Sequence, residues 1–428
     1  MIPDEWRVVR FAEIADYKAG RTPARANPEY WDGAGDGVPW VAISDMTEFD
    51  TVTATKEKIS RAAFEHVFRS QAVRAGTLIM SFKLTIGRVA TLGVDACHNE
   101  AIISIYPKPE VDQRYLGYFL AQVDYDALQD RQVKGNTLNQ EKIDRIEVLL
   151  PPLDEQSSIA NVLDLLRHSI DLQDRALATA EDLKRSAMRE LFTRGLRGEP
   201  QKETEIGPVP ESWNVVPLGS LGRIGNGSTP KKSVHDYWEG GTFPWLTSAK
   251  VYDRDIEAAD QFVTKTALDE CHLPIVKPGA VLIAITGQGK TLGHCAVLRI
   301  EATINQHVAY LQTDTSKADP GFIRGYLETQ YDYLRQVAAG GGSTKGALTC
   351  SFLRSLPLPL PEMAEQREIV AILDAIDRKI DLHRKKRAVL EELFKALLHK
   401  LMTGEIRVDE LDLSVLDRVE SEAEEVVA

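Results

Sequence analysis

The stretch DEQSSIANVLDLLRHSIDLQDRALATAEDLKRSAMRELFTR, from Asp154 to Arg194, carries apolar residues at alternating steps of four and three. This heptad spacing predicts a long helix that packs along its length against another helix. The same pattern returns 210 positions later, between Glu362 and Thr403. The seam residues that we expect to pack helix on helix are Ile159, Leu163, Leu166, Ile170, Leu177, Leu191, Ile369, Leu373, Ile376, Ile380, Leu390, Leu397 and Leu401.

The remainder of the chain also repeats, with a period of about 207 residues. Trp6 recurs as Trp213, and the Thr22-Pro23 pair recurs as Thr229-Pro230. Later in each copy, Asn99 matches Asn305. The protein is therefore a tandem duplication in which a globular part precedes one long helix.

The globular parts contain short runs of β-forming residues between glycine and polar turns. We expect strands at 38–44, 77–82, 87–92 and 101–106, and in the second copy at 243–248, 280–286, 294–300 and 308–312. Helices are expected at 113–129 and 321–337. The predicted class is α+β, with two mostly-β domains, each followed by a long helix. The expected divisions are 1–151, 152–198 (helix), 199–209 (linker), 210–361, 362–404 (helix) and 405–428 (acidic tail).

The two helices are expected to run antiparallel. A helix of about 40 residues is about 60 Å long. A parallel arrangement would require the linker after Arg194 to return along nearly that whole length, which about sixteen residues at ~3.3 Å each could barely span. An antiparallel coiled coil with pseudo-two-fold symmetry needs no such connection.

Composition restricts the function only loosely. The net charge is −13, and about half of it comes from nine acids and two bases between Glu405 and Ala428. The rest of the chain is mildly acidic, so charge neither supports nor excludes binding to DNA. The N-terminus has no apolar signal segment and no apolar run is long enough to span a bilayer, so we expect a cytoplasmic protein. The four cysteines lack metal-binding spacing, so no metal site is expected.

One loop resembles a phosphate-binding site. Residues 286–291, TGQGKT, follow an apolar strand, but the first glycine of a P-loop is replaced by Ala284. A dinucleotide or S-adenosylmethionine loop would require a helix next, and another strand is predicted there. A hairpin turn is the better interpretation. With no catalytic constellation elsewhere, the symmetry leaves two interpretations: paired domains that read two DNA half-sites, or a structural scaffold without nucleic-acid specificity.

Taken together, these features resemble the specificity subunits of type I restriction-modification systems. The resemblance covers nearly the whole chain. Its most specific parts are the Glu155-Gln156 and Glu365-Gln366 helix starts, the LFTRGLRG segment at 191–198 and the IGPVPESW segment at 206–213. It implies two target-recognition domains and two helical spacers, with the coiled-coil length fixing the unread gap of a bipartite DNA target.

The resemblance also implies that this chain is not itself an enzyme and holds no cofactor. Two modification subunits would methylate adenine with S-adenosylmethionine, and restriction subunits would use ATP and magnesium. Arg, Lys, Asn and Gln side chains read bases or bind phosphates. The candidates in or beside predicted loops are Lys18, Arg21, Arg25, Lys56, Lys58, Lys83, Arg88, Asn136, Thr137, Lys231, Lys232, His235, Lys250, Lys290, His294, Ser343, Thr344 and Lys345.

Apolar residues beside the helix seam would widen the apolar face beyond what a two-helix contact needs. We therefore expect them to contact the modification subunits. These residues are Val162, Leu165, Leu172, Met188, Phe192, Ile372 and Leu393.

Overall fold

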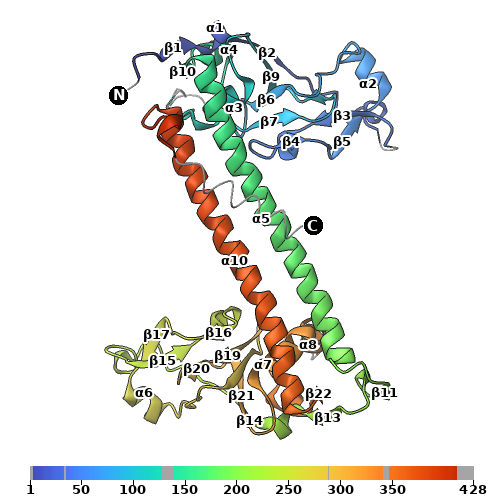
Figure 1. The fold of residues 1–428 in the computed structure, drawn as a ribbon, viewed down its shortest axis with the longest axis vertical. Helices are drawn as coiled ribbons and strands as arrows, with labels where there is room; N and C mark the ends of the chain where they lie inside the picture. Colours follow the sequence, from blue (N-terminus) through green and yellow to red (C-terminus); the bar gives the residue numbers. More distant parts are fainter. Residues whose placement is uncertain (1–2, 33–34, 128–137, 288, 341–346, 412–428) are drawn as a thin grey trace. The chain divides into compact units, whose positions relative to one another are not determined.

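The computed structural model describes residues 3–32, 35–127, 138–287, 289–340 and 347–411, and it divides into two compact units. The first unit comprises residues 1–176 and 384–428, and the second comprises residues 177–383. Each unit contains one globular domain and a part of each long helix, α5 (Leu153–Arg194) and α10 (Met363–Met402) (Figure 1).

The first unit contains a five-stranded sheet, in the order β2-β9-β6-β7-β4, and a three-stranded sheet, β5-β3-β8. Strand β1 pairs with β10, which directly precedes α5. The elements of this unit besides the long helices are β1 (Arg7–Arg10), α1 (Phe11–Ile14), β2 (Ala15–Ala19), η1 (Pro28–Tyr30), β3 (Val38–Val41), η2 (Ile43–Asp45), β4 (Thr51–Val52), β5 (Glu57–Ile59), α2 (Arg61–His66), β6 (Leu78–Ser81), β7 (Val89–Leu92), β8 (Cys97–His98), β9 (Ile102–Pro107), α3 (Gln113–Gln122), α4 (Gln140–Asp144), β10 (Glu147–Leu150) and η6 (Val408–Glu410).

The second unit repeats this topology strand for strand. Its sheets have the orders β14-β21-β18-β19-β16 and β17-β15-β20, and β13 pairs with β22. Its elements are β11 (Gln201–Thr204), β12 (Gly207–Pro210), β13 (Asn214–Pro217), η3 (Leu218–Leu221), β14 (Gly222–Asn226), η4 (His235–Tyr237), β15 (Phe243–Leu246), η5 (Ser248–Tyr252), β16 (Asp255–Ile256), β17 (Gln261–Val263), α6 (Lys265–Glu270), β18 (Ala280–Ala284), β19 (Cys295–Leu298), β20 (Thr303–Ile304), β21 (Val308–Thr313), α7 (Pro320–Thr329), α8 (Tyr331–Gly340), α9 (Cys350–Ser355) and β22 (Pro357–Leu360).

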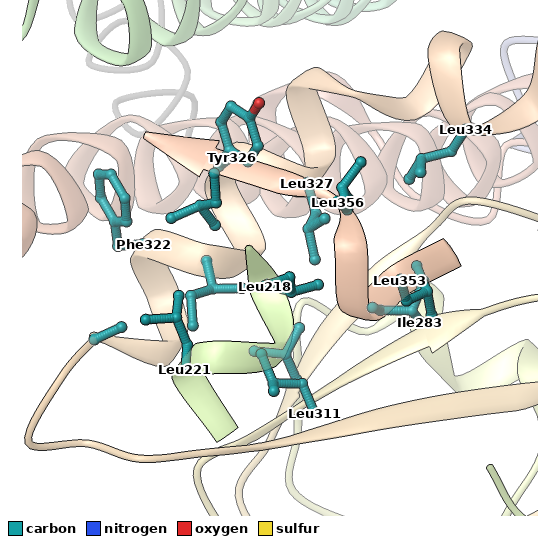
Figure 2. Packing of buried hydrophobic residues seen from close by; sticks show 14 of the residues in the cluster. Leu218, Leu221, Ile283, Leu311, Phe322, Tyr326, Leu327, Leu334, Leu353 and Leu356 are labelled. Atoms are coloured by element: carbon teal, nitrogen blue, oxygen red, sulfur yellow. The ribbon is translucent and has the colours of Figure 1, made fainter. Parts of the chain in front are cut away.

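The central strands are mostly apolar because both of their faces are covered. Every residue of β6 and β18 is buried. In the second unit, Figure 2 shows Leu218 and Leu221 converging with Ile283, Leu311 and Phe322, which come from the sheet and from α7. Burying side chains of this size stabilises the fold by about 1.5–3 kcal/mol each. This core holds the strand ends, and therefore the loops beyond them, in fixed positions.

The long helices pack antiparallel within each unit. In the first unit, Ile159 and Leu163 of α5 share a buried cluster with Leu397 and Leu401 of α10. In the second unit, the other end of α5 packs against the start of α10, where Leu191 joins Ile369 and Leu373 in one cluster. The start of each helix thus meets the end of the other, as the sequence predicts.

The fold differs from expectation in three details. The expected helix 113–129 is shorter, because α3 ends at Gln122, and the expected helix 321–337 is divided into α7 and α8. The segment expected to be a linker contains the β11–β12 hairpin. In contrast, the TGQGKT loop leads from β18 into the antiparallel strand β19, so the hairpin interpretation is confirmed.

Candidate nucleic-acid interface

Three loops of the first unit meet at one end of its five-stranded sheet. The loop after β2 is attached to the β8–β9 turn, because the Gly20 N–H donates to the Ile102 carbonyl at 3.0 Å. The β6–β7 hairpin joins the same turn through a 2.9 Å bond from the Phe82 N–H to the Ala101 carbonyl. We call these three segments the loop cluster.

The second unit builds the same loop cluster from its own residues. The Ser228 N–H donates to the Ile304 carbonyl at 3.0 Å, and the Ile285 N–H donates to the His307 carbonyl at 2.9 Å. Leu348, which follows the glycine-rich segment, donates its N–H to the Ile285 carbonyl at 2.8 Å. Loops that are distant in sequence are therefore held together by backbone bonds, whatever their side chains.

Glycine is required at one position of each cluster because the two loops approach closely. A Cβ atom on Gly20 would lie 2.0 Å from the His98 carbonyl oxygen. On Gly227, it would lie 1.8 Å from the Ile304 carbonyl oxygen. No side chain fits at such distances, so this pair of duplicated glycines maintains the contact between loops.

A groove of about 610 Å³ lies beside the loop cluster of the first unit. Its lining includes the predicted Lys18 and Arg21 together with Arg69 and Arg74, and Arg74 pairs with Asp95 at 2.7 Å. Arg69 and Arg74 were not predicted, because they follow α2 in a segment without a recognisable motif. Four basic side chains against one acid give the groove an excess of positive charge, which suits a phosphate backbone.

All three predicted arginines of the first unit have defined partners, and Arg21 donates to the Val67 carbonyl at 2.7 Å. Arg25 forms a bidentate ion pair with Glu57 and stacks 3.9 Å above the Trp31 ring. The Glu57 hydrogen bond raises the pKa of the Arg25 guanidinium above its usual value. Arg88 is directed inward and donates to the Ile43 carbonyl at 3.2 Å. Arg88 thus supports the hairpin from inside.

Three predicted lysines of the first unit, Lys56, Lys58 and Lys83, have side-chain contacts within their own unit. Lys56 donates to the Ser44 carbonyl at 3.2 Å, and Lys58 donates to the Gly35 carbonyl. The ammonium group of Lys83 lies 5.1 Å from the centre of the ring of its neighbour, Phe82. Lys83 belongs to the loop cluster, whereas Lys56 and Lys58 belong to the smaller sheet and its approaches.

In the second unit, Lys250 and His294 have structural contacts. Lys250 pairs with two acids, the nearer being Asp253 at 3.1 Å. The His294 ring lies between Tyr252 and Tyr331, 4.7 Å from each ring centre, and burial lowers its pKa. The exposed candidates are Lys231, Lys232, His235 and Lys290. The candidates outside the described residues are Asn136, Thr137, Ser343, Thr344 and Lys345.

The apolar residues beside the helix seam mostly cover the chain's own globular domains. Val162 shares a buried cluster with Tyr115 and Tyr118, and the Phe192 ring lies 5.2 Å from the Phe322 ring. The residues expected to contact partners that the structure instead buries within the chain are Val162, Leu172, Met188 and Phe192. Leu165 is half-buried, whereas Ile372 and Leu393 are exposed.

The glutamate of each Glu-Gln pair ties a long helix to the start of a globular domain. The Trp6 indole donates to Glu155 at 3.1 Å, and the Trp213 indole donates to Glu365 at 3.2 Å. The duplicated tryptophan and the duplicated glutamate are therefore partners in both copies.

The neighbouring glutamine accepts a hydrogen bond from the backbone just before α3 or α7. The Asp112 N–H donates to Gln156 at 2.9 Å, and the Asp319 N–H donates to Gln366 at 2.8 Å. Both glutamines are buried. The Glu-Gln motif therefore has a structural role.

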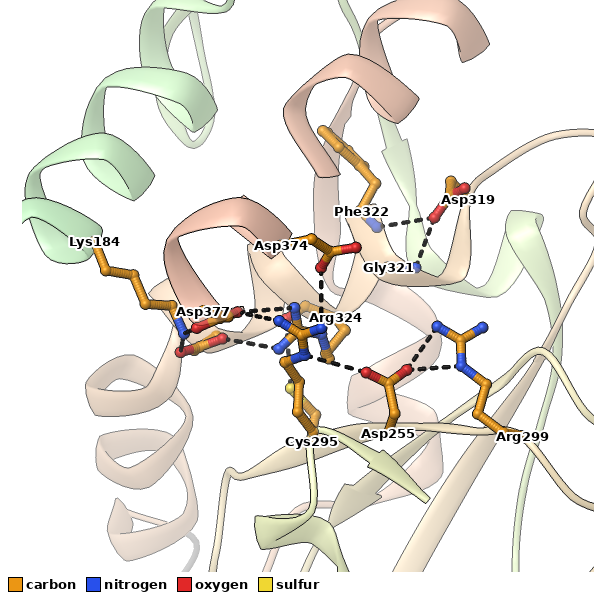
Figure 3. A network of polar contacts seen from close by, with 12 residues as sticks. Lys184, Asp255, Cys295, Arg299, Asp319, Gly321, Phe322, Arg324, Asp374 and Asp377 are labelled. Atoms are coloured by element: carbon orange, nitrogen blue, oxygen red, sulfur yellow. Dashed lines mark hydrogen bonds and ion pairs between the residues drawn. The ribbon is translucent and has the colours of Figure 1, made fainter. Parts of the chain in front are cut away.

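An ionic network joins α10 to the globular domain of the second unit (Figure 3). Asp377 lies 2.7 Å from Arg254 and 2.9 Å from Lys184 of α5. Arg254 also reaches Asp374 at 3.3 Å. Burial alone would raise the pKa of Asp377, but Lys184 and Arg254 hold it below its usual value. The network fixes the helix against the domain.

Among the described residues, no group of three or more potential ligands could hold a metal ion. Likewise, none of the helices in the described part of the chain has the length and apolar character needed to cross a membrane.

Comparison with known proteins identifies the family. The type I restriction modification DNA specificity domain matches the chain twice, over residues 3–181 and 210–392. The chain is 24% identical over 420 residues to the type I restriction enzyme MjaVIII specificity subunit of Methanocaldococcus jannaschii, covering 96% of this chain and 95% of that protein.

Two solved structures share the fold. The S subunit of a type I restriction-modification system from M. genitalium superposes with a TM-score of 0.58 at 15% identity, covering 94% of this chain and 97% of that chain. A second solved chain, from work on complex assembly and conformational transition of the type I R-M system, gives a TM-score of 0.59 at 21% identity, with 95% and 100% covered. The duplicated topology and the paired helices agree with the two family matches. The chain therefore belongs to this family and is the non-catalytic DNA specificity subunit of a type I restriction-modification system.

Proposed function

We propose that each loop cluster reads one half of a bipartite duplex DNA target. The observation that carries this proposal is the construction of the same cluster twice, from equivalent backbone bonds but with different exposed side chains. A shared scaffold gives both domains the same approach to DNA, while different side chains select different bases. The basic groove of the first unit supplies contacts to phosphates.

In this proposal the target-recognition domains occupy 1–151 and 210–361, and the helical spacers occupy 152–198 and 362–404. The direct DNA contacts come from the candidates of the loop clusters and the groove, among them the exposed Lys18, Lys231 and Lys290 and the half-buried Lys83. Arg25, Arg88, Lys250 and His294 position loops through the contacts described above.

We also propose that two modification subunits dock on the long helices. Leu183 of α5 and Leu393 of α10 are 210 positions apart and so occupy equivalent places in the two copies. Their exposed fractions are 56% and 39%, and the proposal rests on this exposure of a leucine at the same place in both copies. One such site on each helix suits two copies of one partner.

The cofactors belong to the partners in this scheme. S-adenosylmethionine would bind to the modification subunits, and ATP with magnesium would bind to restriction subunits. The assembled complex would act on DNA in the cytoplasm.

The decisive experiment is co-expression of the chain with the modification subunit of its own restriction-modification system, followed by mapping of methylated adenines. A two-part motif with a constant gap would support the proposal. Methylation without a sequence motif, or with a single undivided motif, would contradict it. The modification subunit expressed without this chain should produce no methylation at that motif, which serves as the control.

A further inference from the structure

The turn that precedes β9 and the turn that precedes β21 have the same construction. In the β8–β9 turn, the Asn99 side chain accepts a 3.0 Å hydrogen bond from the Ala101 N–H. In the β20–β21 turn, the Asn305 side chain accepts a 3.0 Å bond from the His307 N–H. The asparagine thus sets the same local backbone shape twice. The residue between the bonded pair is held at the tip of the turn.

The tip residue differs between the units, but in both units a threonine hydroxyl donates a hydrogen bond to its side chain. In the first unit, the Thr22 hydroxyl donates to the carboxylate of Glu100. In the second unit, the Thr229 hydroxyl donates to the side-chain oxygen of Gln306. Each threonine belongs to the duplicated Thr-Pro pair, and both tip residues are exposed. One scaffold therefore presents a carboxylate in one domain and an amide in the other.

This difference matters because the two groups recognise different bases. A carboxylate only accepts hydrogen bonds, and in the major groove it pairs with the N4 amino group of cytosine. An amide both donates and accepts, which suits the N6 and N7 atoms of adenine. The threonine holds each group in one orientation before DNA arrives, so less side-chain freedom is given up on binding.

Simpler roles explain Glu100 less well. Phosphates repel a carboxylate on a DNA-facing surface, so a base amino group is the favourable contact available to it there. Neutralising Arg25 does not require Glu100, because Arg25 already forms bonds of 2.5 and 2.9 Å with Glu57.

Gln306 has a further polar neighbour, since its amide nitrogen lies 3.1 Å from His307 Nε2.

We propose that Glu100 and Gln306 are equivalent base-reading residues, Glu100 selecting cytosine in one half-site and Gln306 selecting adenine in the other. This inference rests on the proposed function of the loop clusters. Thr22 and Thr229 are their positioning residues.

The test uses the full chain in complex with its modification subunits and selects bound sequences from a random duplex library. The variants are Glu100→Gln and Gln306→Glu. We expect Glu100→Gln to change one base pair of one half-site from cytosine to adenine, with a change in preference of about 5- to 150-fold. Gln306→Glu should make the reverse change in the other half-site. In each variant the other half-site stays unchanged.

Matched controls make the same chemical changes away from the loop clusters. Glu65→Gln on α2 and Gln261→Glu on β17 alter exposed residues and should leave every base preference unchanged. As a second test, Thr22→Val and Thr229→Val should weaken discrimination at the same base pair while keeping the preferred base. This result does not depend on the first pair of variants remaining folded.

Two outcomes would overturn the inference and leave the proposed function intact. One is a wild-type split motif that neither substitution alters. The other is a Glu100→Gln variant that binds all sequences more tightly without a changed base, which would show that Glu100 acts through charge alone. A wild-type complex that selects no motif would instead contradict the proposed function itself.

Discussion

Arg254 lies 2.7 Å from Asp377, and the equivalent pair in the first unit has its charges exchanged. There the helix supplies the base, Arg167, which lies 3.8 Å from Asp50 of the globular domain. The exchanged pairs occupy the same two places, 210 positions apart on the helices and immediately before β16 and β4. The two junctions nevertheless differ in burial: the side chain of Asp377 is 10% exposed, whereas that of Asp50 is 62% exposed.

We predict that Asp377→Ala lowers the free energy of unfolding by about 1–3 kcal/mol, because Lys184, Arg254 and Arg324 all lose one buried carboxylate. The cost is limited because Glu328 still pairs with Lys184 and Arg324, and Asp374 still pairs with Arg254. Asp50→Ala, the matched change at the solvated junction, should cost about 0–1 kcal/mol. Urea denaturation of both variants measures the difference. Equal costs would show that the two junctions contribute alike.

The stability of the second unit should also fall in acid. The folded pKa of Asp377 is held below its ordinary value of 3.8, so its ion pairs stabilise the fold fully above that pH. The contribution declines as the pH falls from 3.8 through the folded pKa, because the unfolded state binds the proton first. The melting temperature of Asp377→Asn should vary less over this window than that of the wild type. An identical pH profile for both proteins would exclude the aspartate as a source of acid sensitivity.

Gly227→Ala should disrupt the loop cluster of the second unit, since the new methyl group would overlap the Ile304 carbonyl. We expect at least a tenfold fall in duplex DNA affinity, equivalent to about 1.4 kcal/mol. The control is Gly340→Ala at the end of α8, because a Cβ atom there also meets nothing within 4 Å. Affinity measured by fluorescence anisotropy should fall for the first variant alone.

Docking of the modification subunits should depend on the two exposed leucines. Leu183→Glu and Leu393→Glu together are expected to weaken binding by about tenfold or more, because an unpaired carboxylate is costly to bury in an apolar contact. Ile275→Glu changes another exposed apolar residue, 46% exposed and outside the helices, and should not affect binding. Isothermal titration against the modification subunit tests this. Unchanged affinity of the double variant would place the docking site elsewhere.

The basic groove should set part of the salt dependence of DNA binding. Lys18→Ala with Arg69→Ala removes two cations from its lining, and each phosphate that is no longer neutralised reduces the slope of log affinity against log salt by about 0.9. Lys395→Ala on α10, where the lysine side chain is 69% exposed, is the control for a change of net charge. A slope that the double variant does not alter would mean that phosphates do not enter the groove.

Much of the fold could be predicted because the residues that recur in both copies of the duplication are those that maintain the shared structure. The heptad spacing predicted a helix from Asp154 to Arg194, and α5 spans Leu153–Arg194. The antiparallel pairing followed from linker length. Strands of two residues, such as β4 and β16, were not predicted because so short a run has no periodicity to detect.

The site was harder to predict for two physical reasons. A heptad pattern shows that a helix face is apolar but not what covers it, so Phe192 could be covered equally by a partner or by its own domain. An exposed Glu100 or Gln306 is indistinguishable in sequence from an ordinary solvated turn residue. Comparison of the two copies offered the missing signal, since Asn99 and Asn305 align and the next residue differs.

One equivalent position on the two long helices, Phe394 of α10 and Lys184 of α5, has different contacts in the two units. This difference bears on whether one copy could pair with itself. In the first unit, the Phe394 ring of α10 packs 5.8 Å from Phe49 and 6.2 Å from Tyr118. The equivalent residue of α5, 210 positions earlier, is Lys184, which pairs with acidic partners in the second unit. Consider a truncated chain that carries only the first copy and pairs with a second such chain. The ammonium group of Lys184 would then take the place of the Phe394 ring, next to the aromatic rings and Arg167. The copies have therefore diverged into complementary halves, and self-association of one copy would not reproduce the packing of the pair.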